Sequence, residues 1–574
     1  MRYIMIFLIL TACVFGSYYA GGSGTSSSPF QIANKTNLLH LMNDDDPNWA
    51  SGVYFILTAN IDMDSEASDD EIGTKTLPFN ANFDGDGYTI SNIALASDGY
   101  PDYYSGFFGC VGPNGTVHDL NLSTVSIGGM WDVGGFVGIN QGTIYDCTIA
   151  SVTITITVNY AINSGAFCGS NTGNIYDCHV DGTSSVTSAS YRAGGFVGQN
   201  GYRSIEYYMN HIYSGRIYRC YTNATVSVSN KPESGGFFGQ STGVIVDCYS
   251  TGNVSCDGGM SGASLGGFGG HVSGGTISRC HSTGSVTAGG SCSTIGGFVG
   301  ETEHGGTHIN YCYAEGAVSA TNAQSKVGGF CGNMANAIVD HCYATGNVST
   351  TGVGTMVGGF SGQVYLFGGT KEGSMTVTDC WASGSVTGYG SVGGFIGHLD
   401  EDTSLDNCWS KGVVTTNAAG GGASSGGGFT GTDHNTGTTT TSCYWDKTLA
   451  HPLSSVTITA INGDGVHVTV DTSGAHLYWP GDTVNITSTN YNFSGIAIST
   501  ITDADTFVLT NATTGASSTG TVAIATPFSA SGTGKTTTEM KQAATYTDWT
   551  FGPSDWYMTE GSTYPAYYYP KYGF

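Results

Sequence analysis

Positive charge is scarce in this chain of 574 residues. Lysine and arginine together number 16 against 43 aspartates and glutamates, which gives a formal net charge of −27. A surface this acidic lacks the positive footprint that attracts nucleic acid or an anionic membrane surface. We therefore expect no nucleic-acid partner, and we expect the acidic surface to serve solubility or cation binding at a cell surface.

Hydrophobic runs of membrane length are also lacking. Arg2 is followed by an apolar run from Tyr3 to Leu10, which is too short to span a bilayer and is typical of an export signal. We predict a signal peptide over residues 1–17 and no membrane span. Two processing routes stay open, because Leu10-Thr11-Ala12-Cys13 resembles a bacterial lipobox with a lipid anchor at Cys13, whereas Val14-Phe15-Gly16 offers ordinary cleavage.

Known catalytic and cofactor signatures are missing as well. The chain has no His-Glu-x-x-His zinc motif, and its histidines show no ligand pair at a recognised spacing. Gly534-Lys535-Thr536 resembles the end of a phosphate-binding loop, but Ser529 stands where the first glycine would be. A turn before a short helix starting near Thr537 is predicted there, and no cofactor is expected.

Proline is rare, at 12 residues, whereas glycine reaches 90 and the hydrophobic fraction 39%, so the chain has enough apolar material to fold. Its length exceeds one compact core, which favours several domains or an elongated repeat. A repeated sequence motif favours the elongated repeat. The motif Gly-Gly-Phe-x-Gly, or a close variant of it, recurs about every thirty residues, with its aromatic residue at Phe107, Phe136, Phe167, Phe196, Phe237, Phe268, Phe298, Phe330, Phe360, Phe395 and Phe429.

A cysteine follows each of the later motifs, at Cys147, Cys178, Cys220, Cys248, Cys280, Cys312, Cys342, Cys380, Cys408 and Cys443. A period of this length with many glycines and short strand-like pieces predicts an all-β parallel β-helix, or β-solenoid, in which each copy is one coil. Equivalent residues then stack at about 4.8 Å. We predict an internal column of free thiols, with Cys256 and Cys292, in loops off this column, as the best disulfide candidates.

Strand alternation places each cysteine inward and the residue after it outward. The outward residues are aromatic in most coils, so they predict an external strip that could bind a glycan or a partner surface, or could simply stabilise the sheet. Its members are Tyr221, Tyr249, Tyr313, Tyr343, Trp381, Trp409 and Tyr444.

The repeated sequence motifs resemble the GLUG-motif repeats of secreted and surface proteins; examples are Gly296-Gly297-Phe298-Val299-Gly300 and Gly346-Asn347-Val348-Ser349. The resemblance implies a parallel β-helix-like solenoid outside the cell, sometimes the stalk of an adhesin or a peptidase. It carries no common active site, and the missing zinc motif does not support the peptidase versions.

The position of the repeats defines the predicted domain boundaries in the rest of the chain. We predict an N-terminal cap and first coils over residues 18–100, GLUG-like repeats over residues 101–446, and the end of the solenoid over residues 527–574. Residues 453–526 change to dense Val/Ile/Thr alternation with hairpin signals. They predict a small antiparallel β-sandwich or barrel inserted near the C-terminus.

Carboxylates offer two further hypotheses. The clusters Asp44-Asp45-Asp46 and Asp62 to Glu71 could hold a structural calcium ion, although solvated loop charge explains them better. A second set recurs at a coil corner and indicates turn chemistry rather than catalysis; it consists of Asp146, Asp177, Asp247, Asp340 and Asp379. We also expect His271, His281 and His341 to be surface residues.

These features predict an exported, non-enzymatic β-solenoid at the cell surface or outside the cell, acting as a structural or adhesive module. Its expected partner is a surface glycan or a protein that contacts the aromatic strip. Two alternatives stay open: a polysaccharide lyase or hydrolase with a carboxylate cleft, and a phage or particle-borne fibre.

Overall fold

The structure is a computed structural model. It describes residues 18–567 except 43–46, 66, 69–70, 97–103, 158–161, 204–211, 230–232, 259–261, 291, 304, 322, 324, 367–374, 401, 418–424, 435–437, 448–454, 465–467, 473–482, 489–491, 502–505, 510–513, 518–519, 527–532, 547–548, 550, 552–555 and 559–560. The predicted signal peptide and Cys13 lie outside these residues. None of the described helices is long and apolar enough to cross a membrane.

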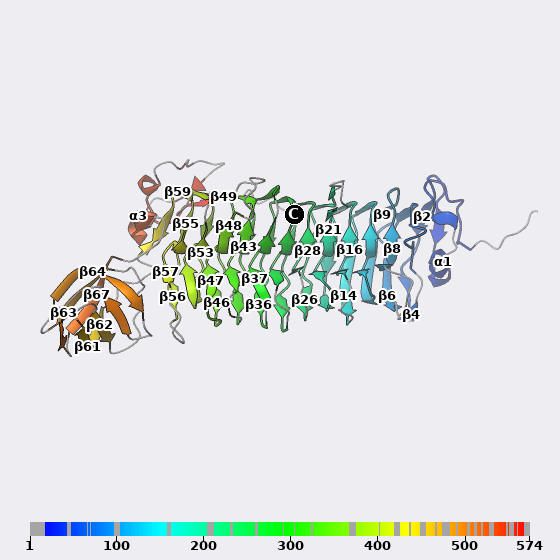
Figure 1. Cartoon of the computed structure of the whole chain (residues 1–574). Helices are drawn as coiled ribbons and strands as arrows, with labels where there is room; N and C mark the ends of the chain where they lie inside the picture. Colours follow the sequence, from blue (N-terminus) through cyan, green and yellow to red (C-terminus); the bar gives the residue numbers. More distant parts are fainter. Residues whose placement is uncertain are drawn as a thin grey trace, which may run out of the picture.

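The chain forms the predicted parallel β-solenoid, a rod of stacked coils (Figure 1). One coil shows the plan: β27 (Glu233–Gly235), β28 (Phe238–Ser241), β29 (Val244–Val246), β30 (Tyr249–Ser250) and β31 (Val254–Cys256) follow one another around the rod. The next coil repeats it with β32 (Ala263–Gly266), β33 (Gly269–Val272), β34 (Gly275–Ser278), β35 (His281–Ser282) and β36 (Val286–Ala288). Each strand pairs in parallel with its counterpart one coil later.

Four sheets therefore run along the rod. We call them sheet 1 (containing β27), sheet 2 (β28), sheet 3 (β29) and sheet 4 (β30 and β31). Sheets 1 and 2 have 11 strands each, sheet 3 has 14 and sheet 4 has 23, because most coils give sheet 4 two short strands.

Stacked phenylalanines form the core beside sheets 1 and 2. From Phe136 to Phe429, successive rings lie with centroids 4.7–4.9 Å apart and all are buried. Phe107 is buried too but packs edge to face on Phe108. Glycine precedes the ring in every coil except that of Phe167, which follows the buried Ala166. The glycine keeps room where coils approach closely: a Cβ at Gly297 would lie 2.1 Å from the carbonyl oxygen of Gly329.

The predicted column of thiols is also confirmed. The backbone N–H groups of Cys178, Cys220 and Cys312 each donate to the Sγ of the next cysteine in the column at 3.4 Å. Every described cysteine is buried, and none of them forms a disulfide. The prediction of a disulfide between Cys256 and Cys292 is wrong in this structure: both lie in strands, not loops, and their thiols are neighbours without a bond.

Both ends of the rod are covered. At the N-terminal end, helix α1 (Lys35–Leu41) is capped by Asn34 and buries Leu38 and Leu41 against the first coils (Figure 1). At the other end, β60 (Tyr444–Asp446) pairs in parallel with β68 (Thr533–Lys535). The solenoid sheet thus resumes after the intervening residues. The short helix α3 (Thr537–Met540) follows, as predicted, and it begins with a complete capping box between Thr536 and Glu539.

The intervening residues fold separately as an antiparallel sheet of 7 strands. Its strands are β61 (Ser455–Asp464), β62 (Val468–Thr472), β63 (Thr483–Ser488), β64 (Asn492–Ile501), β65 (Thr506–Leu509), β66 (Thr514–Ser517) and β67 (Gly520–Thr526). Because β61 pairs with both β62 and β67, the sheet closes on itself. Of the two predicted forms, it is therefore the barrel.

Candidate functional site

The outer face of sheet 4 carries a continuous stack of rings, which we call the aromatic row. It occupies the first residue of β18 (His179–Asp181), β25 (Tyr221–Thr222), β30, β35, β40 (Tyr313–Ala314), β45 (Tyr343–Ala344), β50 (Trp381–Ala382) and β55 (Trp409–Ser410). Successive centroids lie 4.4–5.1 Å apart and the ring planes differ by at most 10°. The sequence reading missed His179 and His281 because it considered only the larger aromatic side chains.

The stacking decides which part of each ring faces solvent. Each inner ring has a neighbour on both faces, so its apolar faces contact other rings. The half-buried members Tyr249, Tyr313 and Tyr343 offer solvent only their edges and hydroxyl groups. A sugar that stacks on a ring needs a free face, so this row can contact a ligand only through edges and polar atoms.

Two predicted members do not face solvent. Trp409 is 1% exposed and Tyr444 is 8% exposed, because the C-terminal segment folds over this end of sheet 4. Tyr564 stacks on Trp409 at 5.4 Å and Tyr546 packs edge to face on Tyr444 at 5.2 Å. The expectation of a solvent-facing strip through Trp409 and Tyr444 is therefore wrong, and its exposed part ends at Trp381.

A row of hydroxyl groups runs beside the aromatic row on sheet 4. Pairing in register aligns Ser227, Ser255, Thr287, Ser319, Ser349, Thr387 and Thr415. Over the five coils 249–256, 281–288, 313–320, 343–350 and 381–388, Glu315 is the only acidic or basic side chain apart from histidine. Burial lowers the pKa of His281 to about 4, so its ring is neutral at physiological pH. On a strongly acidic protein, this face is almost uncharged.

Sheets 1 and 2 carry a different surface, which we call the polar ladder. Register aligns Gln199, Gln240, His271, Glu301, Asn333, Gln363, His398 and Thr432 along sheet 2. Their side chains bond to one another and to side chains of sheet 1: Gln199 donates to Gln240 at 3.1 Å, and Ser264 donates to Glu301 at 3.0 Å. Several members are nearly buried because the two sheets crowd their side chains together.

His271 is the centre of the charged part of this ladder. Its Nδ1 lies 3.2 Å from Glu233 and its Nε2 lies 3.6 Å from Glu303, while Arg192 bonds to Glu233 at 2.9 Å. Burial alone would lower the pKa of His271, but Glu233 and its acidic neighbours raise it above the ordinary value. The prediction of His271 as a surface residue is wrong, since it is 7% exposed. His281 is half-buried in the aromatic row, and His341 is half-buried at a corner.

The recurring aspartates serve the coil corners. Asp146, Asp177, Asp247 and Asp379 all have φ between 51° and 56°, the left-handed region that aspartate tolerates better than most residues. Arg279 of the next coil bonds to both oxygens of Asp247. The prediction that Asp340 occupies a corner is wrong by one residue. His341 has the left-handed corner conformation there, and Asp340 is the last residue of β44 (Ala337–Asp340). Turn chemistry accounts for the row.

The acidic clusters near the N-terminus are only partly described. Asp44, Asp45, Asp46, Glu66, Asp69 and Asp70 lie outside the described residues. Asp62 accepts hydrogen bonds from Asn92 and from the backbone of Asp64, and Asp64 pairs with Lys35 at 3.1 Å. These contacts fit the interpretation of a turn with solvated charge around Asp62 and Asp64. For Glu71 that interpretation is wrong, because its side chain is buried and accepts a hydrogen bond from the backbone N–H of Gly106 at 3.3 Å.

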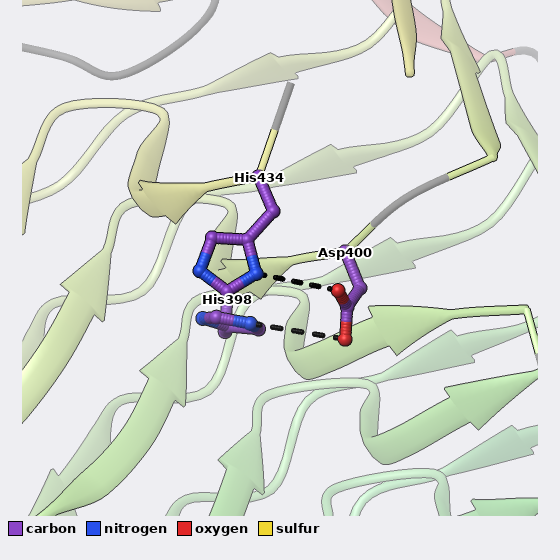
Figure 2. Close-up of side chains that lie close together, drawn as sticks. All are labelled: His398, Asp400 and His434. Atoms are coloured by element: carbon purple, nitrogen blue, oxygen red, sulfur yellow. Dashed lines mark hydrogen bonds and ion pairs between the residues drawn. The ribbon is translucent and has the colours of Figure 1, made fainter. Parts of the chain in front are cut away.

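A group of three ligand-type side chains lies at the far end of the polar ladder (Figure 2). His398 is in β53 (Ile396–Leu399), Asp400 follows that strand, and His434 follows β58 (Thr430–Asp433) in the next coil. Asp400 Oδ1 lies 3.4 Å from His434 Nδ1, and its Oδ2 lies 3.9 Å from His398 Nε2. The sequence search missed this pair of histidines because they belong to different coils. A His-x-Asp segment followed one coil later by a histidine is the signal that would have found it.

Comparison with known proteins supports the repeat assignment. Residues 323–349 match the GLUG motif, which confirms the resemblance predicted from the repeated sequence motifs. Halomucin of Haloquadratum walsbyi is 33% identical over 144 residues, 23% of this chain and 2% of halomucin. A protein of Evansella cellulosilytica described as a Gly-rich membrane protein is 30% identical over 142 residues, 23% of this chain and 16% of that protein. The chain therefore spans only a small part of both relatives.

A solved structure also shows a likeness. A Bacteroides ovatus protein described as an immunoglobulin A1 protease is 20% identical, with 74% of this chain and 87% of that chain covered and a TM-score of 0.28. Two structures that superimpose this loosely support no argument about function.

Proposed function

We propose that this β-solenoid with a GLUG motif is an exported structural and adhesive module at the cell surface or outside the cell. The proposed binding surface is the face of sheet 4, and its partner is an uncharged surface glycan or a protein with an uncharged, hydroxyl-rich surface. The observation that carries the proposal is the combination of aromatic and hydroxyl rows over five coils with Glu315 as the single formal charge.

Physical chemistry supports an uncharged partner. A net charge of −27 repels acidic polymers from most of the molecule. The sheet 4 face offers hydroxyl groups, tyrosine hydroxyls and ring edges at the regular spacing of stacked strands, about 4.8 Å. Each such contact is weak, at about 1 kcal/mol for a hydrogen bond. Affinity would therefore come from many repeated contacts along an extended ligand.

The relatives fit this proposal in broad terms. The name halomucin and the description of the Evansella protein as a membrane protein both suit a location at the cell surface. A rod that holds its shape by repeated stacking also suits a spacer or stalk. In this proposal the main role of the aromatic row is to stabilise the rod, and the edges of its rings contact the partner.

Charge-insertion variants test the proposal. Ser319→Asp and Thr287→Asp place a carboxylate on the sheet 4 face without changing the core. Thr376→Asp, on the outer face of sheet 3 in β49 (Met375–Thr378), is the matched control. On a glycan array and by calorimetry, we expect the two sheet 4 variants to bind at least about tenfold more weakly, which corresponds to roughly 1.4 kcal/mol. The control should bind like the parent. Equal binding by all three variants would contradict the proposal.

A polysaccharide-active enzyme is the second candidate function. The observation that favours it is the gathering of Glu233, His271 and Glu303 in the polar ladder, because paired carboxylates beside a titratable group can perform acid–base chemistry. Release of new reducing ends from a bound polysaccharide would identify the enzyme. Binding without turnover favours adhesion, and a homotrimeric mass in solution would instead favour the particle-borne fibre.

A further inference from the structure

We infer that His398, Asp400 and His434 form a binding site for a transition-metal dication, with Zn²⁺ as the natural occupant. Among the described residues, two groups bring three ligand-type side chains close enough together to share one ion, and this is the one with two imidazoles. Two nitrogen ligands and one carboxylate suit Zn²⁺, whereas Ca²⁺ and Mg²⁺ prefer an all-oxygen shell.

The distances match the size of a zinc site. All three ligand atoms lie within 4.8 Å of one another. Ligands at about 2.0–2.1 Å from a tetrahedral zinc are about 3.3 Å apart. His434 Nδ1 lies 3.4 Å from Asp400 Oδ1, which already has this value, whereas His398 Nε2 lies 3.9 Å from the other oxygen, Asp400 Oδ2. The three side chains must therefore move closer together to share one ion. In Figure 2 both histidine rings lie to the same side of the carboxylate, each linked to one of its oxygens.

The hydrogen bonds around His398 leave the correct nitrogen free for a metal. Thr432 donates its hydroxyl proton to Ser391 at 3.2 Å, so its oxygen is free to accept the proton of His398 Nδ1 at 2.6 Å. The Nε2 of the neutral ring then carries a lone pair toward the Asp400 carboxylate. A cation between the ring nitrogen and the carboxylate, either a proton bound to Nε2 or a metal ion, removes the repulsion between these two acceptors.

Outer contacts hold the other ligands in place. Gln363 donates to Asp400 Oδ2 at 3.3 Å, and the backbone N–H of His434 donates to the carbonyl oxygen of Leu399 at 3.0 Å. Metal sites commonly fix their ligands through such partners. His434 is the accessible ligand, with 61% of its side chain exposed. The site is therefore three-coordinate from the protein, and its remaining position faces solvent.

Zinc titration of the purified full chain tests the inference. In competition with a chromophoric chelator, the parent should bind one Zn²⁺ tightly. His434→Ala and Asp400→Asn should each weaken that binding by more than the roughly 10- to 100-fold that loss of an outer partner costs. Thr432→Val should weaken it within that 10- to 100-fold range. Because His434 is on the surface, His434→Ala should keep the parent circular dichroism spectrum and thermal unfolding.

The second ligand group provides the matched control. Asp84, His118 and Asp119 also lie close together but include one imidazole. His118→Ala should leave the tight zinc site unchanged, and Co²⁺ bound to the parent should show the visible absorption of a nitrogen-ligated site that His434→Ala abolishes. The inference is overturned if the parent binds no zinc at micromolar concentration, or if His434→Ala and Asp400→Asn bind zinc like the parent.

Discussion

His281 gives the sharpest quantitative prediction about the aromatic row. Its ring is stacked between Tyr249, with centroids 4.9 Å apart, and Tyr313, at 4.6 Å. This burial lowers its pKa from 6.5 to about 4. We consider the variant His281→Tyr, which places in this coil the residue found in the coils on both sides.

The direction in which stability changes with pH depends on whether the folded or the unfolded chain binds the proton more tightly. Above pH 6.5 the imidazole is neutral in the folded and the unfolded chain, so it adds no pH dependence. As the pH falls below 6.5, the unfolded chain takes up a proton that the folded chain accepts only near pH 4, and stability decreases across this window. The difference between a pKa of 6.5 and one of about 4, at about 1.4 kcal/mol for each pH unit, amounts to about 3.5 kcal/mol at the acid end. His281→Tyr should lose this part of the acid destabilisation.

Urea unfolding of parent and variant between about pH 4 and pH 8 measures the effect, since carboxylates shared by both proteins cancel in the difference. Tyr313→Phe is the control, because it removes no group that titrates in this range. NMR titration of the His281 ring provides a direct check. A midpoint at or above 6.5 would refute the reasoning, because it would mean that the tyrosine faces stabilise the imidazolium more than burial opposes it.

Two further predictions concern the core and the polar ladder. Phe298→Ala should lower the free energy of unfolding by about 3–5 kcal/mol, because it removes a fully buried ring from the middle of the phenylalanine stack. Phe298→Leu should lower it clearly less in the same denaturation assay. A loss below about 1 kcal/mol for the alanine variant would contradict the stack as a stabilising core. For His271, the folded-state pKa is raised by Glu233, so its contribution is complete below pH 6.5 and is lost as the pH rises through the folded value. The stability difference between the parent and His271→Gln should therefore shrink as the pH rises above 6.5, and a difference that grows with pH would disprove the assigned ion pairs.

Much of the fold follows from periodicity. The spacing of Phe298 and Phe330, or of Cys312 and Cys342, equals one coil, and parallel pairing in register turns residues one coil apart into neighbours. Because the stack places equivalent residues at a fixed separation, the thiol column, the ring stack and the corner aspartates could all be predicted from the order of the residues.

Contacts between different positions of the repeat could not be predicted in this way. His271 was misjudged because its partners Glu233 and Glu303 belong to different coils and different positions of the repeat. These side chains meet because sheets 1 and 2 contact each other, and no periodic pattern specifies which of their residues come together. The Cys256 and Cys292 prediction failed for a related reason, since their places in strands depend on how each loop closes.

The sequence alone determined the coil length, the residues that point inward and the presence of an insertion near the C-terminus, because these depend on local alternation and on repetition along the chain. The tertiary structure alone decided that the C-terminal segment buries Trp409 and Tyr444, and that His398 and His434 share one carboxylate. These last features depend on where chain ends and strand ends come to lie in space, and distance along the chain does not specify that.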